Sequence, residues 1–200
     1  MNALSLFITI VVIVSILALV TVIWIKFGLS GIESPDRRAG RQGEKFASGI
    51  IEEILDNTDV LLRNVHITHN GEQTELDNVI INNAGVTVVE VKNWFGELFG
   101  EEDDPKWIQN KTSSGGGVIQ QTVRNPILQV KRQVRILSEI LADNSVTADV
   151  KGFVFFVNMN SPVESEYILT TQEDIDRAIH SKREKTLSDG EVEMVTGIIR

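Results

Sequence analysis

Residues 73–92 contain two strand-like segments joined by a short turn, and this pair constrains the fold more than any other feature. Segments 73–81 and 85–92 are rich in Val, Ile and Thr and are bounded by Gly and Asn, a pattern typical of β-strands. The residues between them, 82–85 (NNAG), are turn-forming, and Gly85 can adopt a positive φ. A turn centred between Asn83 and Ala84 predicts an antiparallel hairpin with Asp77 directly opposite Glu90.

This register brings two carboxylates together at one place on the hairpin. Directly opposed residues have Cβ atoms about 4.5–5.5 Å apart, and side-chain alternation puts Glu90 and Lys92 on the same face. The other residues of that face are apolar: Val79, Ile81, Val86 and Val88. Carboxylates in such surroundings repel each other unless a cation or a proton offsets their charge.

Carboxylate oxygens suit Mg²⁺ or Mn²⁺, so the hairpin predicts a metal site. Lys92 would lie close to water bound to the ion, where it would orient that water or stabilise charge developing on a phosphate. The alternative is a structural ion pair between Lys92 and either Asp77 or Glu90. A short Asp…Glu-x-Lys pattern by itself does not distinguish the two.

Residues 3–25 form a nearly continuous apolar run, which is long enough to span a bilayer as a helix. No basic residue precedes the run and no small-residue cleavage site ends it, so we expect a transmembrane anchor; a cleaved signal peptide is the alternative. A linker at 26–36 follows. The basic residues lie after the run: Lys26, Arg37, Arg38, Arg41 and Lys45. The positive-inside rule predicts a single-pass protein of the cell membrane, with its N-terminus outside and its C-terminal domain in the cytoplasm.

The remaining residues, 37–200, are enough for one domain with its own core, and the motifs lie within 37–158. The net charge of −9 argues against a protein that coats nucleic acid non-specifically, although it leaves room for an enzyme with a local basic groove. The absence of cysteine excludes disulfides and thiolate metal sites and fits a reducing compartment.

Other segments predict a mixed β-sheet flanked by helices, which is an α/β fold. We expect helices over 40–56 and from Asn125-Pro126 onward, where Asn is a favoured N-cap and Pro a favoured first residue. Strands are expected at 59–68, 96–99, 150–158 and 167–170, and a flexible loop at 111–117. Capping-box patterns at 171–174 and 188–191 begin two further helices.

Two polar residues on these helices are candidates for the same site. Glu44 begins the apolar stripe of the first helix, where it is either directed at a site or a first-turn glutamate favoured by the helix dipole. Gln129 and Gln133 lie beside the apolar face of the second helix. Their alternative is an ordinary surface position.

Taken in order, these residues resemble a known family over about 35 to 130. The matching positions are Gly40-x-x-Gly43-Glu44, residues 74–77 (TELD), Gly85, residues 88–94 (VVEVKNW), Gly96, Trp107 and Asn125-Pro126-x-x-Gln129. The set is similar to the NERD (nuclease-related domain) family of the PD-(D/E)xK nuclease superfamily. The resemblance implies that Asp77 and Glu90 are metal ligands, with the Val91 carbonyl as a third candidate. It also implies that Lys92 positions or activates the attacking water, and that Glu44 and Gln129 reach the site from their helices.

We therefore expect a membrane-anchored nuclease that uses Mg²⁺ or Mn²⁺ to hydrolyse phosphodiester bonds in DNA or, secondarily, RNA. A second hypothesis is a non-catalytic module that binds nucleic acid or a protein partner at the membrane, consistent with the net charge and the tether. A third is a metal-dependent hydrolase of another phosphoester, such as a nucleotide.

Overall fold

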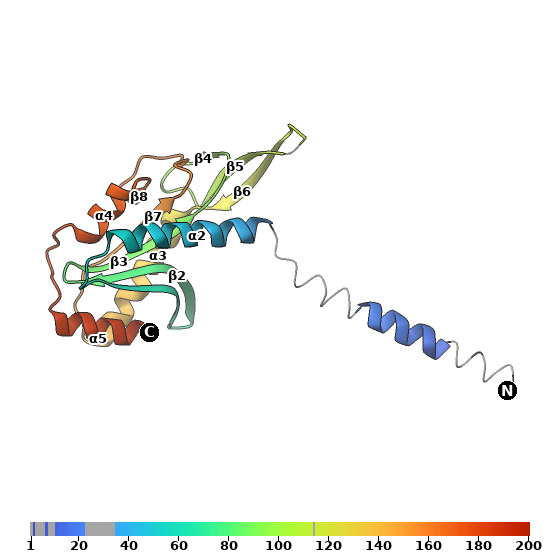
Figure 1. The fold of residues 1–200 in the computed structure, drawn as a ribbon, viewed down its shortest axis with the longest axis horizontal. Helices are drawn as coiled ribbons and strands as arrows, with labels where there is room; N and C mark the ends of the chain where they lie inside the picture. Colours follow the sequence, from blue (N-terminus) through green and yellow to red (C-terminus); the bar gives the residue numbers. More distant parts are fainter. Residues whose placement is uncertain (1, 3–6, 8–10, 23–34, 114) are drawn as a thin grey trace. The chain divides into compact units, whose positions relative to one another are not determined.

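The computed structural model describes residues 2, 7, 11–22, 35–113 and 115–200 (Figure 1). The chain forms two compact units, Met1–Ala39 and Gly40–Arg200. Residues 11–22 are helical and exposed. Within the described ranges, no helix has both the length and the apolar character needed to cross a bilayer. The expected anchor at 3–25 lies partly outside those ranges, and the linker at 26–36 lies almost wholly outside them.

A five-stranded mixed sheet forms the centre of the second unit. Its spatial order is β1 (Val60–His69), β2 (Glu72–Asn82), β3 (Gly85–Lys92), β7 (Val150–Phe156) and β8 (Ile168–Leu169). The β1–β2 and β2–β3 pairs are antiparallel, whereas the β3–β7 and β7–β8 pairs are parallel. Strand β3 is central, and it is buried from Gly85 to Val91. The mixed α/β class predicted from the sequence is confirmed.

The β2–β3 hairpin has the register that the turn chemistry predicts. Asn82 pairs with Gly85, and the ladder continues to the Asn78–Val89 pair. Gly85 has a φ of 137°, and a Cβ there would lie 2.6 Å from the Asp149 carbonyl oxygen. This position therefore requires glycine both for its backbone conformation and for the close approach of the chain before β7.

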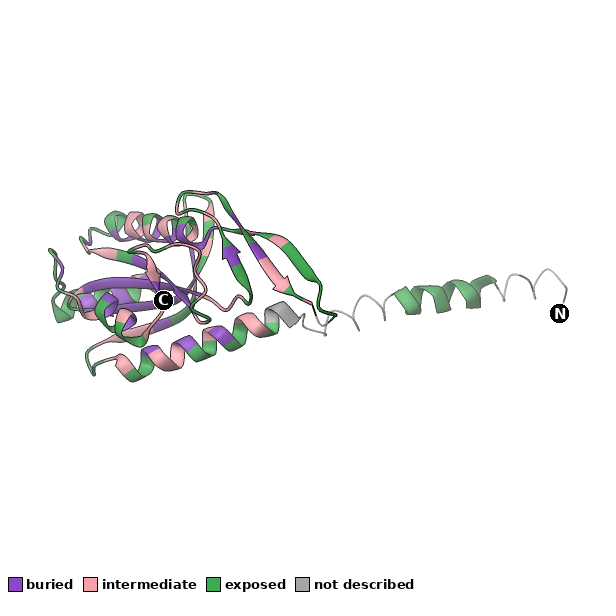
Figure 2. Cartoon of the chain, turned by 90° about the horizontal axis from the view of Figure 1, so that it is seen from above, coloured by how far each residue is buried: buried purple, intermediate pink, exposed green. Residues whose placement is uncertain are grey.

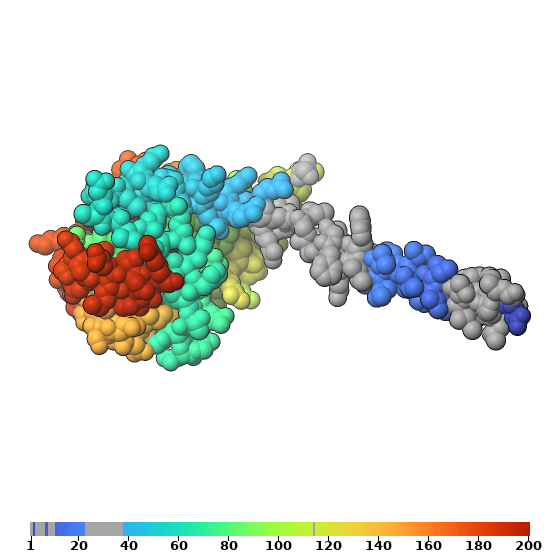
Figure 3. All heavy atoms as spheres, turned by 60° about the horizontal axis from the view of Figure 1, so that its bottom comes forward, coloured from blue at the N-terminus to red at the C-terminus, as the bar shows by residue number. Residues whose placement is uncertain are grey.

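Helices cover both faces of the sheet (Figure 1). Helices α3 (Pro126–Asp143) and α5 (Asp189–Ile199) share one core with the first face, and they lie side by side on the surface in Figure 3. Helices α2 (Pro35–Ile54) and α4 (Gln172–His180) share a second core with the opposite face. Figure 2 shows the central strands buried between these two layers.

Three helix starts use the caps read from the sequence. The Asn125 side chain accepts a hydrogen bond from the Ile127 N–H at 2.8 Å, and complete capping boxes begin α4 at Thr171 and α5 at Ser188. Helix α2 starts at Pro35, five residues before the expected start at Gly40, because proline at a first helical position already has the required φ.

A second sheet contains β4 (Glu97–Phe99), β5 (Lys106–Thr112) and β6 (Val118–Arg124), all antiparallel. Of the expected loop at 111–117, residues 111 and 112 belong to β5, and residues 113 and 115–117 lie between β5 and β6, at the tip of a β-hairpin that the sequence did not predict. Its strands were missed because they are largely exposed and polar and lack an apolar alternation. Trp107 is an exception: it is fully buried, and its ring stacks on Phe156 at a centroid distance of 6.2 Å.

Candidate active site

Asp77 lies where the regular pairing of β2 is interrupted on both sides. The β2–β3 ladder ends at Asn78–Val89, one position before Asp77. On the other side, the β1–β2 register passes from Arg63–Asn78 to Val65–Leu76, and the intervening Asn64 has a left-handed φ of 51°. The Asp77 Oδ2 atom accepts a hydrogen bond from the Val91 N–H at 2.8 Å. The irregular backbone thus turns this carboxylate toward β3, where residue 90 lies.

Glu90 is held by three side-chain donors. Its side chain is only 4% exposed. Its Oε1 accepts from the Gln129 amide at 2.6 Å and from the Lys92 ammonium, and its Oε2 accepts from the Gln133 amide at 2.7 Å. Each of the two Glu90 oxygens therefore has at least one side-chain donor, and the three donors fix the orientation of the carboxylate.

Helix α3 supplies two of these donors from successive turns. Gln129 and Gln133 are four residues apart and therefore lie on the same side of the helix. Gln133 is fully buried, and its amide also donates to the Glu75 carbonyl at 2.8 Å. The sequence placed Gln133 beside the apolar face but did not assign it to the site. The signal that would have identified it is its spacing of one helical turn from Gln129.

The pKa values of two carboxyl groups at the site, Asp77 and Glu44, are raised. Burial, followed by repulsion from Glu90, raises the pKa of Asp77 to about 7, although the Val91 N–H and Lys92 act in the opposite direction. Burial also raises the pKa of Glu44, and Glu75 and Glu90 add to that effect. The site therefore carries more negative charge than Lys92 offsets.

Helix α2 brings Glu44 to the site from the opposite face of the sheet. A Cβ at the neighbouring Gly43 would lie 2.3 Å from the Asn93 Cβ, so the helix approaches the end of β3 more closely than any side chain would allow. The electrostatic influence of Glu90 and Lys92 on Glu44 follows from this approach. Four of the residues singled out in the sequence, Asp77, Glu90, Lys92 and Gln129, lie together where the β2–β3 pairing ends, and Glu44 is close enough to be influenced by the charges of Glu90 and Lys92.

Two asparagines after β7 support the chain that leaves Lys92. The Asn158 amide donates to the Asn93 side chain at 2.8 Å and to the Trp94 carbonyl at 2.9 Å. The Asn160 amide donates to the carbonyls of Trp94 and Gly96 at 3.0 and 2.7 Å. Trp94 in turn places its ring centroid 5.7 Å from the Lys92 Nζ. No local pattern in the sequence points to these supporting residues, because they act through a contact with a distant segment.

The donor set fits a hard divalent cation. Asp77 and Glu90 offer carboxylate oxygens, and Mg²⁺ is commonly held by one or two carboxylates together with water. The raised pKa of Asp77 shows that the site favours an added positive charge. An ion bound there would share Glu90 with its three hydrogen-bond donors.

Comparison with known proteins agrees with this geometry. The family described as "Nuclease-related domain" matches residues 39–157, a range that contains all the residues of the site. A protein of Bacillus anthracis described as uncharacterized is 25% identical over 165 residues, which cover 78% of this chain and 73% of that protein. No solved structure matches the chain.

Proposed function

Because this chain belongs to the nuclease-related domain family, we propose that it is a Mg²⁺- or Mn²⁺-dependent nuclease that hydrolyses phosphodiester bonds, in DNA before RNA. One observation carries the proposal: Asp77, Glu90 and Lys92 converge at one end of the β2–β3 hairpin, with excess negative charge. A purely structural ion pair would not require the additional carboxyl groups of Asp77 and Glu44 in the same place.

Each side chain of the site would have its own role in such a reaction. Asp77 and Glu90 would hold the metal, which when bound lowers the pKa of water and offsets charge on the phosphate. Gln129 and Gln133 keep the Glu90 oxygens oriented. Lys92, beside Glu90 and Trp94, would donate a hydrogen bond to the attacking water or to a phosphate oxygen.

Glu44 has a separate position in this scheme. It comes from α2 rather than from the sheet, and its raised pKa means that it keeps a proton to higher pH than an exposed glutamate. A carboxyl group of this kind would exchange a proton with water or with a leaving oxygen at the margin of the site.

The test is a cleavage assay of the full chain on single- and double-stranded DNA and RNA, with Mg²⁺, with Mn²⁺ and with a chelator. We expect metal-dependent cleavage, and Lys92→Ala should lower the rate by about 10²–10³, as removal of one preorganised donor does elsewhere. Lys151→Ala is the matched control, because Lys151 is exposed and pairs with the opposite end of β3, at Thr87. Equal activity in Lys92→Ala would contradict the mechanism.

A second candidate function is metal-independent binding of nucleic acid or a protein partner. It is favoured by the network around Glu90, in which both carboxylate oxygens already have protein donors. Fluorescence anisotropy with labelled oligonucleotides in a chelator distinguishes the two functions. Binding that survives both Asp77→Ala and Glu90→Gln would support the binding module over the enzyme. A separate assay, the release of inorganic phosphate from nucleotides, would identify a different phosphoester substrate.

We also propose that residues 3–25 anchor the protein in the cell membrane, with the N-terminus outside and the second unit in the cytoplasm. The apolar composition of the run and the basic residues after it support this orientation. Because the chain has no cysteine, a single introduced cysteine is a unique label. In intact cells, a membrane-impermeant maleimide should label Asn2→Cys but should label Lys151→Cys only after lysis. The reverse pattern would contradict the orientation.

A further inference from the structure

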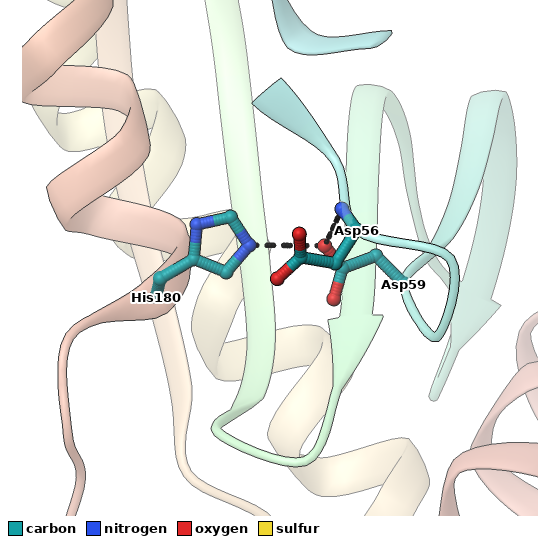
Figure 4. Close-up of side chains that lie close together, drawn as sticks. All are labelled: Asp56, Asp59 and His180. Carbon is teal, nitrogen blue, oxygen red and sulfur yellow. Dashed lines mark hydrogen bonds and ion pairs between the residues drawn. The ribbon is translucent and has the colours of Figure 1, made fainter. Parts of the chain in front are cut away.

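A second group of metal-ligating side chains lies at another corner of the sheet. Asp56 and Asp59 are in the turn between α2 and β1, and His180 is the last residue of α4 (Figure 4). One potential ligand atom from each of the three lies within 4.8 Å of the others. Asp59 is followed by Val60, which pairs with Ile81 on β2. Ile81 is four residues from Asp77, so their positions along β2 are about 13 Å apart. This corner is therefore separate from the candidate active site.

The backbone holds the two aspartates in a fixed relation. The Asp59 N–H donates to the Asp56 carbonyl at 3.0 Å, and the Asp56 N–H donates to the Asp59 Oδ2 at 2.8 Å. The Asp59 side chain is only 3% exposed, and a histidine, rather than a lysine or an arginine, meets its charge. Asp56 is the exposed member of the three residues.

The spacing of these atoms suits a transition-metal ion. The His180 Nε2 lies 2.9 Å from the Asp59 Oδ2. Two ligands that bind one ion tetrahedrally at about 2.0–2.2 Å stand about 3.4 Å apart. The two atoms would have to separate by about 0.5 Å to bind one ion. A mixed imidazole and carboxylate set favours Zn²⁺ and its neighbours over Mg²⁺.

The other nitrogen of His180 provides an independent observation. Its Nδ1 lies 2.7 Å from the Oδ1 of Asp176, one helical turn earlier in α4. Histidines that bind metals nearly always donate their second N–H to such a carboxylate, which fixes the ring and directs the free nitrogen at the ion. Asp176 is outside the three-residue group and would not be needed for a simple Asp59–His180 ion pair.

We propose that Asp56, Asp59 and His180 form a structural site for Zn²⁺ or a similar divalent transition metal, with Asp176 as the positioning residue. Binding breaks the N–H bond at His180 Nε2 and releases that proton to solvent, while the Nδ1 proton stays on the ring and donates to Asp176. Water completes the coordination on the exposed side. The ion would join the start of β1 to the end of α4, which are 121 residues apart in the sequence.

The test is a Zn²⁺ titration of the full chain, followed by NMR of the histidine side chains. The chain has only three histidines, so His66 and His69 serve as internal references. We expect the Nε2 resonance of His180 to move to a metal-bound position, saturating at one ion per chain, with the other two rings unaffected. A His180 ring that does not respond to Zn²⁺ would overturn the proposal.

Two substitutions separate a metal site from an ion pair. Asp56→Asn removes an exposed ligand and keeps the Asp59–His180 contact, so the metal-free melting temperature should not change while Zn²⁺ affinity falls at least tenfold. Asp176→Asn should weaken Zn²⁺ binding about 10- to 100-fold through the orientation of the ring. Asp77→Asn should leave the His180 response intact. Unchanged Zn²⁺ affinity in Asp56→Asn would refute the three-ligand site.

Discussion

Asp77 and Glu90 lie on neighbouring strands, just beyond the last pair of the β2–β3 ladder, and they accept hydrogen bonds from different donors. Glu90 receives two amides and an ammonium group, whereas Asp77 receives one backbone N–H. Donors lower the free energy of the ionised form, and burial raises it. Burial and the nearby charge of Glu90 raise the pKa of Asp77, so we expect this carboxyl to be the group through which pH and a bound cation act on the site.

The pKa of Asp77 predicts how stability depends on pH without metal. It is about 7 in the folded state against 3.8 for the ordinary aspartate, so the folded protein holds more protons between these values and its free energy of unfolding falls as pH rises from about 4 to about 7. In a chelator, Asp77→Asn should remove most of this fall. At pH 8 it should stabilise the protein by up to about 4 kcal/mol, measured by urea denaturation.

The control for this experiment is the same substitution in the presence of Mg²⁺. Mg²⁺ should stabilise the wild type more at pH 8 than at pH 5, because protons compete for Asp77 at the lower pH. Asp77→Asn should lose most of that stabilisation. A wild type whose stability rises between pH 5 and pH 7 in a chelator would contradict the assignment of the raised pKa.

Gln133 provides a second test at this scale. Replacing it by Met keeps a similar volume but removes the donor shared by the Glu90 carboxylate and the Glu75 carbonyl. Unsatisfied buried acceptors of this kind cost about 1–3 kcal/mol, so we expect that loss in the free energy of unfolding. Gln120→Met, at an exposed position in β6, should change stability by less than about 0.5 kcal/mol.

At the scale of elements, local chemistry predicts some features well and others poorly. The β2–β3 hairpin and α3 were predictable because Gly85 and Asn125-Pro126 impose their geometry without help from distant residues. The β5–β6 hairpin was not, because its strands are stabilised mainly by pairing with each other and bury little apolar surface. Likewise, the register predicted that Asp77 and Glu90 would meet, but the only sign that Gln133 would complete the site was its spacing of one helical turn from Gln129.

Helix α2 contains a matched pair of glycines that tests its contact with β3. A Cβ at Gly43 would overlap the Asn93 side chain, whereas a Cβ at Gly49 would have no atom within 4 Å. Gly43→Ala should destabilise the protein by about 1–3 kcal/mol through overpacking and should lower activity by displacing Glu44. Gly49→Ala should stabilise it by about 0.5–1 kcal/mol through helix propensity. Equal effects in thermal denaturation would show that α2 does not press against Asn93.

At the scale of the whole molecule, one buried arginine joins elements that are distant in sequence. Arg183 stands between Lys182 and Lys185 in a basic stretch of the sequence, but the structure buries it at 4% exposure. Its guanidinium donates to the carbonyls of Val86 and Asp149 at 2.9 Å, to the Ala178 carbonyl at 3.2 Å and to the Thr87 hydroxyl. Composition cannot distinguish such an arginine from a solvated one, because its acceptors come from three separate segments.

Removing this arginine should weaken the whole unit of residues 40–200. Arg183→Met leaves several buried acceptors without a donor, so we expect a loss of about 2–4 kcal/mol in the free energy of unfolding. The urea midpoint should fall while the slope of the transition stays the same. Lys182→Met, at the exposed neighbouring position, should have little effect, and equal midpoints for the two variants would contradict the role of Arg183.

The distance along the chain between Glu90 and Gln133 has a consequence for biosynthesis. Ribosomes release the chain from its N-terminus, so Asp77 and Glu90 emerge before the helix that supplies the two glutamines. Until α3 has been synthesised and has packed against the sheet, Glu90 lacks the amide donors of Gln129 and Gln133. A nascent chain therefore cannot complete the hydrogen bonds around Glu90 until α3 has been synthesised.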